Sequence, residues 1–223
     1  IDSDSGETVI DLAQDGYGDR YYDLTFSADG TLLMFTYHGE ITVYNVETGE
    51  VDYSVLPFNY IPAQDFSAST FHGFDVAAMS ADASWVGGTY ARPNDTSLVF
   101  FGEYGADDLM VIESEVQIPE RTTAFAIAPD GSRGIVGDER GNLRGWSLPD
   151  FEYSSFIRGE RSSTSNRIND IIFHPTEPII VTAESDPLAV VRVFDATTFA
   201  QIRAPVLALD NLSSVAHDLA FSP

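Results

Sequence analysis

The sequence repeats one short pattern at intervals of about fifty residues. In each copy an apolar segment ends in an aromatic or aliphatic residue, which we call the anchor, and a tight turn follows. The anchors are Phe26, Met79, Ile127, Phe173 and Phe221, which stand 53, 48, 46 and 48 residues apart. The turns contain Pro, Asp or Gly, where a reversal needs a fixed or a positive φ. Such a period is typical of repeat folds, in which each unit stacks on its neighbours to bury its apolar faces.

The segments around each turn have the composition of β-strands. Those after the turns read TLLMFTY, SWVGGTY, SRGIVGD and EPIIVTAE, and their mixture of alternation and short apolar runs favours strands over helices. A second landmark follows about twenty residues behind the anchor, as an aromatic and a small polar residue before a turn: Tyr44-Asn45, Trp146-Ser147 and Phe194-Asp195. In the second repeat, LVFFGEYGADD is a loose version in which Phe100 or Phe101 would fill the aromatic position. The two landmarks predict antiparallel strands joined by hairpins.

These landmarks resemble those of WD-repeat (WD40-like) β-propellers. The resemblance covers nearly the whole chain and rests on the FSADG and APDG turns and on the aromatic-polar pairs. It implies an all-β fold of four-stranded antiparallel blades around a central channel, with loops on one face that usually bind other proteins. The repeats depart from the family pattern, because the Gly-His dipeptide is missing and only Phe194 is followed by Asp. The family's hydrogen-bonded Asp-His-Ser-Trp network is therefore without clear support.

The repeats also predict where the blades lie. We expect four full blades and two partial ones, at 20–58, 72–118, 122–157 and 167–207, and at 1–15 and 216–223. The chain opens at the end of a third strand and closes with AHDLAFSP, which is only a first strand. Because a propeller closes by completing one blade from its two ends, we expect a fragment of a larger propeller that continues beyond Pro223 and before Ile1. A small self-closed propeller is the alternative.

Several residues recur at fixed places and are interpreted as structural. An Asp stands three residues before the anchor in three repeats, and the second landmark supplies an aromatic residue in three. These structural repeat residues are Asp23, Asp170, Asp218, Tyr44, Trp146 and Phe194. Because propeller blades pack through large apolar side chains, we expect both Trp85 and Trp146 in the core between blades.

The charge of the chain limits its partners. There are 35 acidic and 11 basic residues, all of the latter Arg, and the net charge is -24. This surface repels phosphates, so we expect no nucleic-acid partner, whereas a basic protein partner or a high-salt environment would suit it. No segment approaches the ~20 apolar residues of a membrane helix, so no membrane partner is expected. The absence of a visible signal peptide favours a cytoplasmic protein.

Motifs for catalysis or cofactor binding are missing from the sequence. The four histidines do not have the spacing of a zinc site, and neither a GxSxG turn nor a phosphate-binding glycine loop occurs. We therefore expect no enzyme, no metal and no cofactor, and we interpret His174 as structural or exposed. The hairpin DERGN is expected at the surface, where a pair between Asp138 or Glu139 and Arg140 would contribute little.

Two inserts, 57–73 and 102–115, are candidate partner-contact sites. Their candidate contact residues are Phe58, Tyr60, Phe66, Phe71 and Tyr104. Aromatic side chains contribute strongly to interfaces, although they can equally cover the gap between adjacent blades. We predict a non-catalytic scaffold that binds a protein through loops on the propeller face. The alternatives are the sensor or docking tail of a multidomain bacterial regulator, which VRVFDATTFAQIRAP and HDLAFSP resemble, and a lactonase-like enzymatic propeller.

Overall fold

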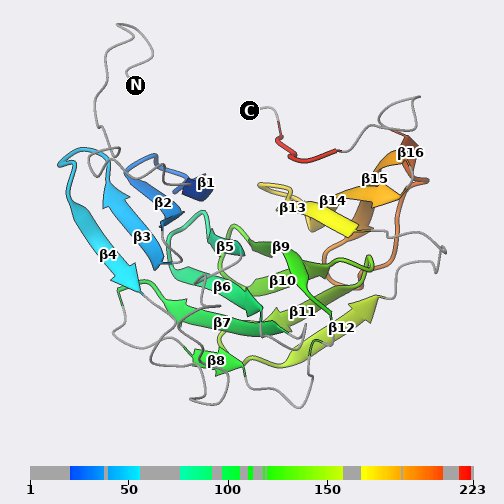
Figure 1. Ribbon diagram of the computed structural model, residues 1–223, viewed down its shortest axis with the longest axis horizontal. Coiled ribbons are helices and arrows are strands. Elements are labelled where there is room, and N and C mark those ends of the chain that lie inside the picture. Colours follow the sequence, from blue (N-terminus) through cyan, green and yellow to red (C-terminus); the bar gives the residue numbers. More distant parts are fainter. Residues whose placement is uncertain are drawn as a thin grey trace, which may run out of the picture.

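The computed structural model describes residues 21–37, 40–55, 76–91, 97–105, 110–112, 118, 120–157, 167–186, 188–207 and 216–221. All regular elements in these ranges are β-strands, which form four antiparallel sheets of four strands each. The sheets follow one another in an arc, as the colours from blue to orange show (Figure 1). The predicted all-β fold of four-stranded antiparallel blades is confirmed. No helix in the described part of the chain is long and apolar enough to cross a membrane.

Each blade is a sheet in which consecutive strands are neighbours. Blade 1 consists of β1 (Tyr21–Phe26), β2 (Leu32–Tyr37), β3 (Glu40–Asn45) and β4 (Val51–Val55). Blade 2 consists of β5 (Val76–Met79), β6 (Trp85–Ala91), β7 (Ser97–Glu103) and β8 (Met110–Ile112). Blade 3 consists of β9 (Thr122–Ile127), β10 (Arg133–Asp138), β11 (Leu143–Ser147) and β12 (Tyr153–Ile157). Blade 4 consists of β13 (Arg167–Phe173), β14 (Ile179–Asp186), β15 (Leu188–Asp195) and β16 (Val206–Leu207).

The first strand of each blade lies innermost in the arc and the fourth lies outermost (Figure 1). Because neighbouring strands are antiparallel, the first and third turns of every blade lie at one end of the sheet. We call this end the turn face. The second hairpin of each blade and the connections between blades lie at the opposite end, which we call the loop face.

The turns after the anchors are closed by the aspartates that the sequence pattern contains. Asp29, Asp82 and Asp130 each accept a hydrogen bond from the backbone N–H two residues later, at 3.0, 3.0 and 3.1 Å. A side chain that bonds its own backbone in this way stabilises a tight reversal. The same turns need a left-handed residue, and Gly131 supplies it with a φ of 67°.

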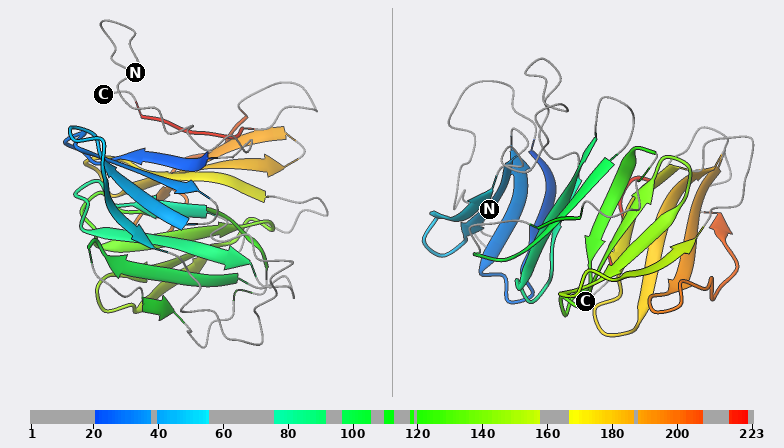
Figure 2. Two further views of the ribbon diagram at one scale, coloured as in Figure 1. Left: turned by 60° about the vertical axis from the view of Figure 1, so that its left-hand side comes forward. Right: turned by 90° about the horizontal axis from the view of Figure 1, so that it is seen from below.

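The core consists of three apolar clusters, one between each pair of adjacent blades. The blades stand face to face in the view from below (Figure 2). Because successive side chains on a strand point to opposite faces, a blade between two others needs apolar residues at consecutive positions. Phe100 therefore packs between blades 1 and 2, and its neighbour Phe101 packs between blades 2 and 3.

The strand register corrects one prediction for blade 2. In the other three blades, the residue seven places after the anchor pairs with the aromatic landmark. In blade 2 the corresponding residue, Val86, pairs with Gly102. The prediction that Phe100 or Phe101 fills the aromatic position is therefore wrong. The physical reason is that the hairpin between β6 and β7 sets their register. A shift of one residue would place Phe101 opposite Val86, but it would also move every side chain of β7 to the other face of the sheet.

Blades 2 and 3 are in close contact at a glycine. The ring of Phe101 lies against the backbone of Gly134, and a Cβ atom on Gly134 would overlap this ring. Phe101 also packs on the rings of Phe125 and Trp146, with centroid distances of 5.3 and 6.3 Å. Trp85 and Trp146 both belong to this cluster, which agrees with their predicted position between blades.

Residues 216–221 lie beside blade 4 on the inner side of the arc (Figure 1). The side-chain amide of Asn169 donates a hydrogen bond to the Ala216 carbonyl at 2.8 Å. The Leu219 N–H donates to the carboxylate of Asp170 at 2.7 Å. The segment therefore has the same position relative to β13 that β5 has relative to β1.

Candidate functional site

The innermost strands surround a central cavity of about 630 Å³. Each blade contributes residues of its first strand to the wall, and residues 218 and 219 add to it. Three carboxylates line the cavity: Asp23, Asp170 and Asp218. Two apolar side chains of β1 also line it and are largely exposed, Leu24 at 64% and Phe26 at 58%. The structure thus brings together the three aspartates that recur in the sequence.

At the cavity wall, Asp23 connects blade 1 to blade 2, and Asp170 connects blade 4 to residues 216–221. Asp23 Oδ2 accepts a hydrogen bond from the Ala77 N–H at 3.1 Å, and Asp170 Oδ2 accepts one from the Leu219 N–H. Ala77 and Leu219 each stand two residues before the anchor of the following repeat. An innermost strand has one edge without a strand partner, so its N–H groups need other acceptors. This need explains why an Asp recurs three residues before the anchor.

The environment of these carboxylates raises their pKa values. Burial raises the pKa of Asp23 from 3.8 to about 6, and the charge of Asp170 adds to the rise, although hydrogen bonds from Ala77 and Thr36 oppose it. Burial also raises the pKa of Asp170, and the charge of Asp218 contributes. A positive group that enters the cavity would relieve this repulsion. Among the described residues, no three His, Cys, Asp or Glu side chains are grouped to hold a metal ion.

We expect Asp23→Asn to raise the free energy of unfolding at neutral pH by up to about 3 kcal/mol. The folded-state pKa of Asp23 lies above the unfolded value, so the folded protein binds this proton more tightly. Stability therefore falls as pH rises from about 4 to about 6 and stays low above that range. The Asn variant keeps an oxygen to accept the Ala77 N–H bond but has no charge.

Urea unfolding of both proteins across this pH range tests the prediction. The stability difference between variant and wild type should grow with pH and level off above about pH 6. A difference that is constant, or that is largest in acid, contradicts the assigned pKa shift.

The aromatic landmarks lie in the blades, away from the aspartates. Tyr44 is half-buried and stacks on Phe35, with a centroid distance of 5.6 Å. Trp146 and Phe194 are buried in the clusters between blades. The indole N–H of Trp146 is buried and has no hydrogen-bond partner among the described residues. The sequence likewise gives no clear support for the family's Asp-His-Ser-Trp network.

Tyr104 follows β7 and lies at the turn face, against blade 1. Its ring packs on that of Tyr53 with a centroid distance of 5.5 Å, and its hydroxyl donates a hydrogen bond to the Asp52 carboxylate. Burial raises the pKa of Tyr104, and the Asp52 contact raises it further. Tyr104 thus bridges two blades, and its role in partner contact stays a prediction. The other candidate contact residues, Phe58, Tyr60, Phe66 and Phe71, lie outside the described residues.

The hairpin after β10 contains a buried ion-pair network, which corrects the prediction of a surface pair. Asp138 is fully buried and accepts hydrogen bonds from Arg144 and from the Asn142 side chain, both at 2.7 Å. Arg144 also pairs with Glu120 at 3.2 Å, and the exposed Arg140 pairs with Glu120 at 3.1 Å. The partner of Asp138 is therefore Arg144. The sequence did not reveal this network, because folding brings Glu120 of the connection between blades onto β11.

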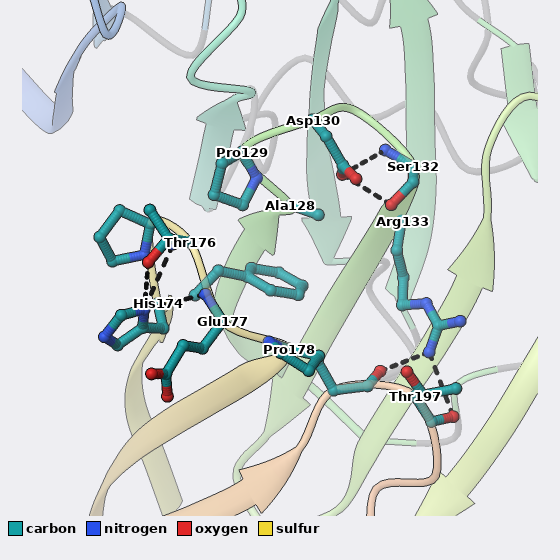
Figure 3. Close-up of a pocket in the computed structure, with 13 residues that line it drawn as sticks. Ala128, Pro129, Asp130, Ser132, Arg133, His174, Thr176, Glu177, Pro178 and Thr197 are labelled. Atoms are coloured by element: carbon teal, nitrogen blue, oxygen red, sulfur yellow. Dashed lines mark hydrogen bonds between the residues drawn. The ribbon is translucent and has the colours of Figure 1, made fainter.

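A second cavity of about 460 Å³ lies at the turn face between blades 3 and 4. The turn after β9, with Pro129 and Asp130, forms one wall, and the turn after β13 forms another (Figure 3). In the latter turn the Nδ1 atom of His174 accepts hydrogen bonds from the N–H groups of Thr176 and Glu177, at 3.2 and 3.0 Å. His174 thus provides the side-chain acceptor that closes this turn, although it stands one residue after the anchor and the closing Asp of the other turns stands three residues after it. This contact is in accord with a structural role.

Comparison with known proteins finds similarity at the level of structure. No protein-family model matches the sequence, and no curated protein is similar to it. A structure of U3-55K matches with a TM-score of 0.60 and 13% identity, over 84% of this chain and 52% of that chain. A crystal structure of RRP9 WD40 repeats matches with a TM-score of 0.60 and 14% identity, over 84% and 51%. The chain has the WD40-like propeller fold.

This result confirms the resemblance that the repeat landmarks indicated. The WD40-like chain spans about half the length of these two structures. Identities of 13% and 14% establish the fold alone, because one fold supports many unrelated functions. The function of this WD40-like propeller therefore has to be inferred from its own cavities and charges.

Proposed function

We propose that this WD40-like propeller is a non-catalytic protein-interaction module that binds a basic segment of a partner at its central cavity. The observation that supports this function best is the lining of the cavity. Three carboxylates and the exposed side chains of Leu24 and Phe26 share one opening of about 630 Å³. Exposed apolar groups next to charged ones are typical of protein-binding surfaces.

The chemistry of the cavity favours Arg or Lys side chains. These residues have an apolar stem and a charged head, which match the apolar wall and the carboxylates. Burial raises the pKa values of Asp23 and Asp170, and the charges of Asp170 and Asp218, respectively, add to the rise. A cation bound among these carboxylates is stabilised by the same charges. An Arg guanidinium can in addition donate two parallel hydrogen bonds to one carboxylate. The net charge of -24 would attract such a partner at long range.

The two alternatives remain predictions. A lactonase-like enzyme needs convergent metal ligands or an acid-base pair at the channel, and the described residues offer no group of three metal ligands. The tail of a bacterial regulator would use the same kind of binding surface. Partner binding at the central cavity is therefore the function that we test.

A fluorescein-labelled peptide of alternating Arg and Leu should bind the chain, and a matched peptide of Glu and Leu should not. We expect the affinity to fall at least about tenfold between about 0.1 M and about 1 M salt, because the Debye length shrinks from about 10 Å to about 3 Å. The double variant Asp170→Asn with Asp218→Asn should lower the affinity by about tenfold or more, which corresponds to about 1.4 kcal/mol. Fluorescence anisotropy measures both effects.

The matched control removes the same charge from a distant turn. Glu47 and Glu50 are exposed in the third turn of blade 1, so Glu47→Gln with Glu50→Gln changes the net charge equally without touching the cavity. This control should bind nearly as well as the wild type. If both double variants lose peptide affinity equally, the peptide responds only to the overall charge of the chain, and the proposed site is wrong.

A further inference from the structure

The turn face is joined from blade to blade by backbone hydrogen bonds, with one interruption. The Ala28 N–H donates to the Ala81 carbonyl at 2.7 Å, which joins blades 1 and 2. The Asp82 N–H donates to the Pro129 carbonyl at 3.1 Å, which joins blades 2 and 3. Between blades 3 and 4 both turns are described in full, and no backbone hydrogen bond connects them. The cavity of about 460 Å³, which we call the turn-face groove, opens at this place (Figure 3).

The blade 4 turn also has no free N–H group to offer to blade 3. Pro175 and Pro178 have no N–H to donate, and the N–H groups of Thr176 and Glu177 are used within the turn by His174. The missing bond from blade 3 to blade 4 is therefore not replaced by a bond in the opposite direction.

Arg133 holds the two blades together at the outer end of the groove. Its guanidinium donates hydrogen bonds to the carbonyls of Ala196 and Thr197, the latter at 3.3 Å, and lies 5.7 Å from the centroid of the Phe199 ring. Figure 3 shows Arg133 directed at the Thr197 carbonyl. The guanidinium of Arg133 thus connects blade 3 to blade 4. This contact maintains the shape of the groove.

The interior of the groove combines an apolar floor with an acidic rim. The floor includes Phe173, which is half-buried, whereas the anchors Met79 and Ile127 at the closed interfaces are only 3% and 6% exposed. The carboxylates of Asp130 and Glu177 lie at the rim in exposed positions. An apolar side chain next to a basic one would match both features.

The groove also offers a backbone donor. The Asp130 N–H occupies the place in its turn that the Asp82 N–H occupies in blade 2, three residues after the anchor. The Asp82 N–H bonds to a carbonyl of the next blade, whereas the turn of blade 4 provides no such acceptor to Asp130. A peptide carbonyl is the chemical group that would replace it.

We propose that the turn-face groove binds an extended peptide segment of a partner protein. A peptide carbonyl accepts from the Asp130 N–H, an apolar side chain packs on Phe173, and an adjacent Arg or Lys pairs with Asp130 and Glu177. This inference goes beyond the central cavity, although Pro129 and Phe173 line both cavities.

Titration of the ¹⁵N-labelled chain with a capped hexapeptide Ser-Gly-Leu-Arg-Gly-Ser tests this proposal. The peptide should shift the amide signals of Asp130, Ser132 and Glu177 saturably, and the counterpart with Glu in place of Arg should not. We expect Glu177→Lys to weaken binding at least about tenfold, because it places a like charge next to the peptide's Arg.

The matched control is Glu47→Lys, which makes the same charge change on an exposed turn-face residue of blade 1 and should leave the affinity unchanged. Equal weakening by Glu47→Lys, or no saturable shifts at millimolar peptide, would overturn the groove proposal. If Asp170→Asn weakens binding of the hexapeptide and Glu177→Lys does not, the peptide occupies the central cavity. That outcome overturns the groove and leaves the proposed function intact.

Discussion

Replacing Arg144 by Met is expected to lower the free energy of unfolding by about 3–5 kcal/mol. Arg144 is only 4% exposed and pairs with Asp138, which has no exposed side-chain surface. Removing one partner of a buried pair leaves the other charge without compensation, and Met fills much of the same volume without restoring it. Urea unfolding measures the effect, and the slope with urea concentration should stay constant if only stability changes.

The control for this prediction is Arg140→Met in the same network. Arg140 pairs with Glu120, as Arg144 does, but the Arg140 side chain is 69% exposed. A solvated ion pair contributes at most about 1 kcal/mol, so this variant should remain close to the wild type. If Arg144→Met and Arg140→Met have the same small effect, the network does not stabilise blade 3 in the way its burial indicates.

Replacing Phe101 by Ala is expected to lower the free energy of unfolding by about 3–5 kcal/mol. Phe101 is fully buried and fills the space between blades 2 and 3, where it contacts Phe125, Trp146 and Phe151. Gly134 lies directly under the ring and has no side chain with which to fill the resulting cavity. The loss therefore includes both the burial of the ring and the unfilled volume. Thermal and urea unfolding measure it.

Phe26→Ala is the matched control, because it removes the same group from a side chain that is 58% exposed. Surface substitutions of this kind usually change stability by less than about 0.5 kcal/mol. A large effect of Phe26→Ala would show that its ring is covered in solution. A small effect of Phe101→Ala would show that blades 2 and 3 do not depend on their contact.

The carboxylate–arginine pair of blade 3 has a counterpart in blade 4, which suggests a shared structural role. Arg192 donates to the buried Glu184 at 2.9 Å, and both Arg144 and Arg192 stand two residues before the aromatic landmark. The corresponding position holds Thr42 in blade 1 and, by strand register, Phe100 in blade 2. At this position blades 3 and 4 therefore have an ion pair in addition to apolar packing, whereas blades 1 and 2 have no ion pair there.

The candidate sites could be predicted from the sequence only in part. The recurrence of Asp23, Asp170 and Asp218 was visible, but not that all three line one cavity. The turn-face groove could not be predicted from the sequence. It forms where blades 3 and 4 lack a backbone hydrogen bond that joins blades 1 and 2 and blades 2 and 3.

The strands, the turns and the period of the blades followed from the sequence by itself, because each depends on residues close together in the chain. Turn residues select tight reversals, and alternation selects strands. The tertiary structure alone decided that Asp138 is buried against Arg144, that Gly102 stands at the aromatic position, and that blades 3 and 4 leave a groove. These features depend on strand register and on the distance between stacked sheets, which are set by packing between segments far apart in the sequence.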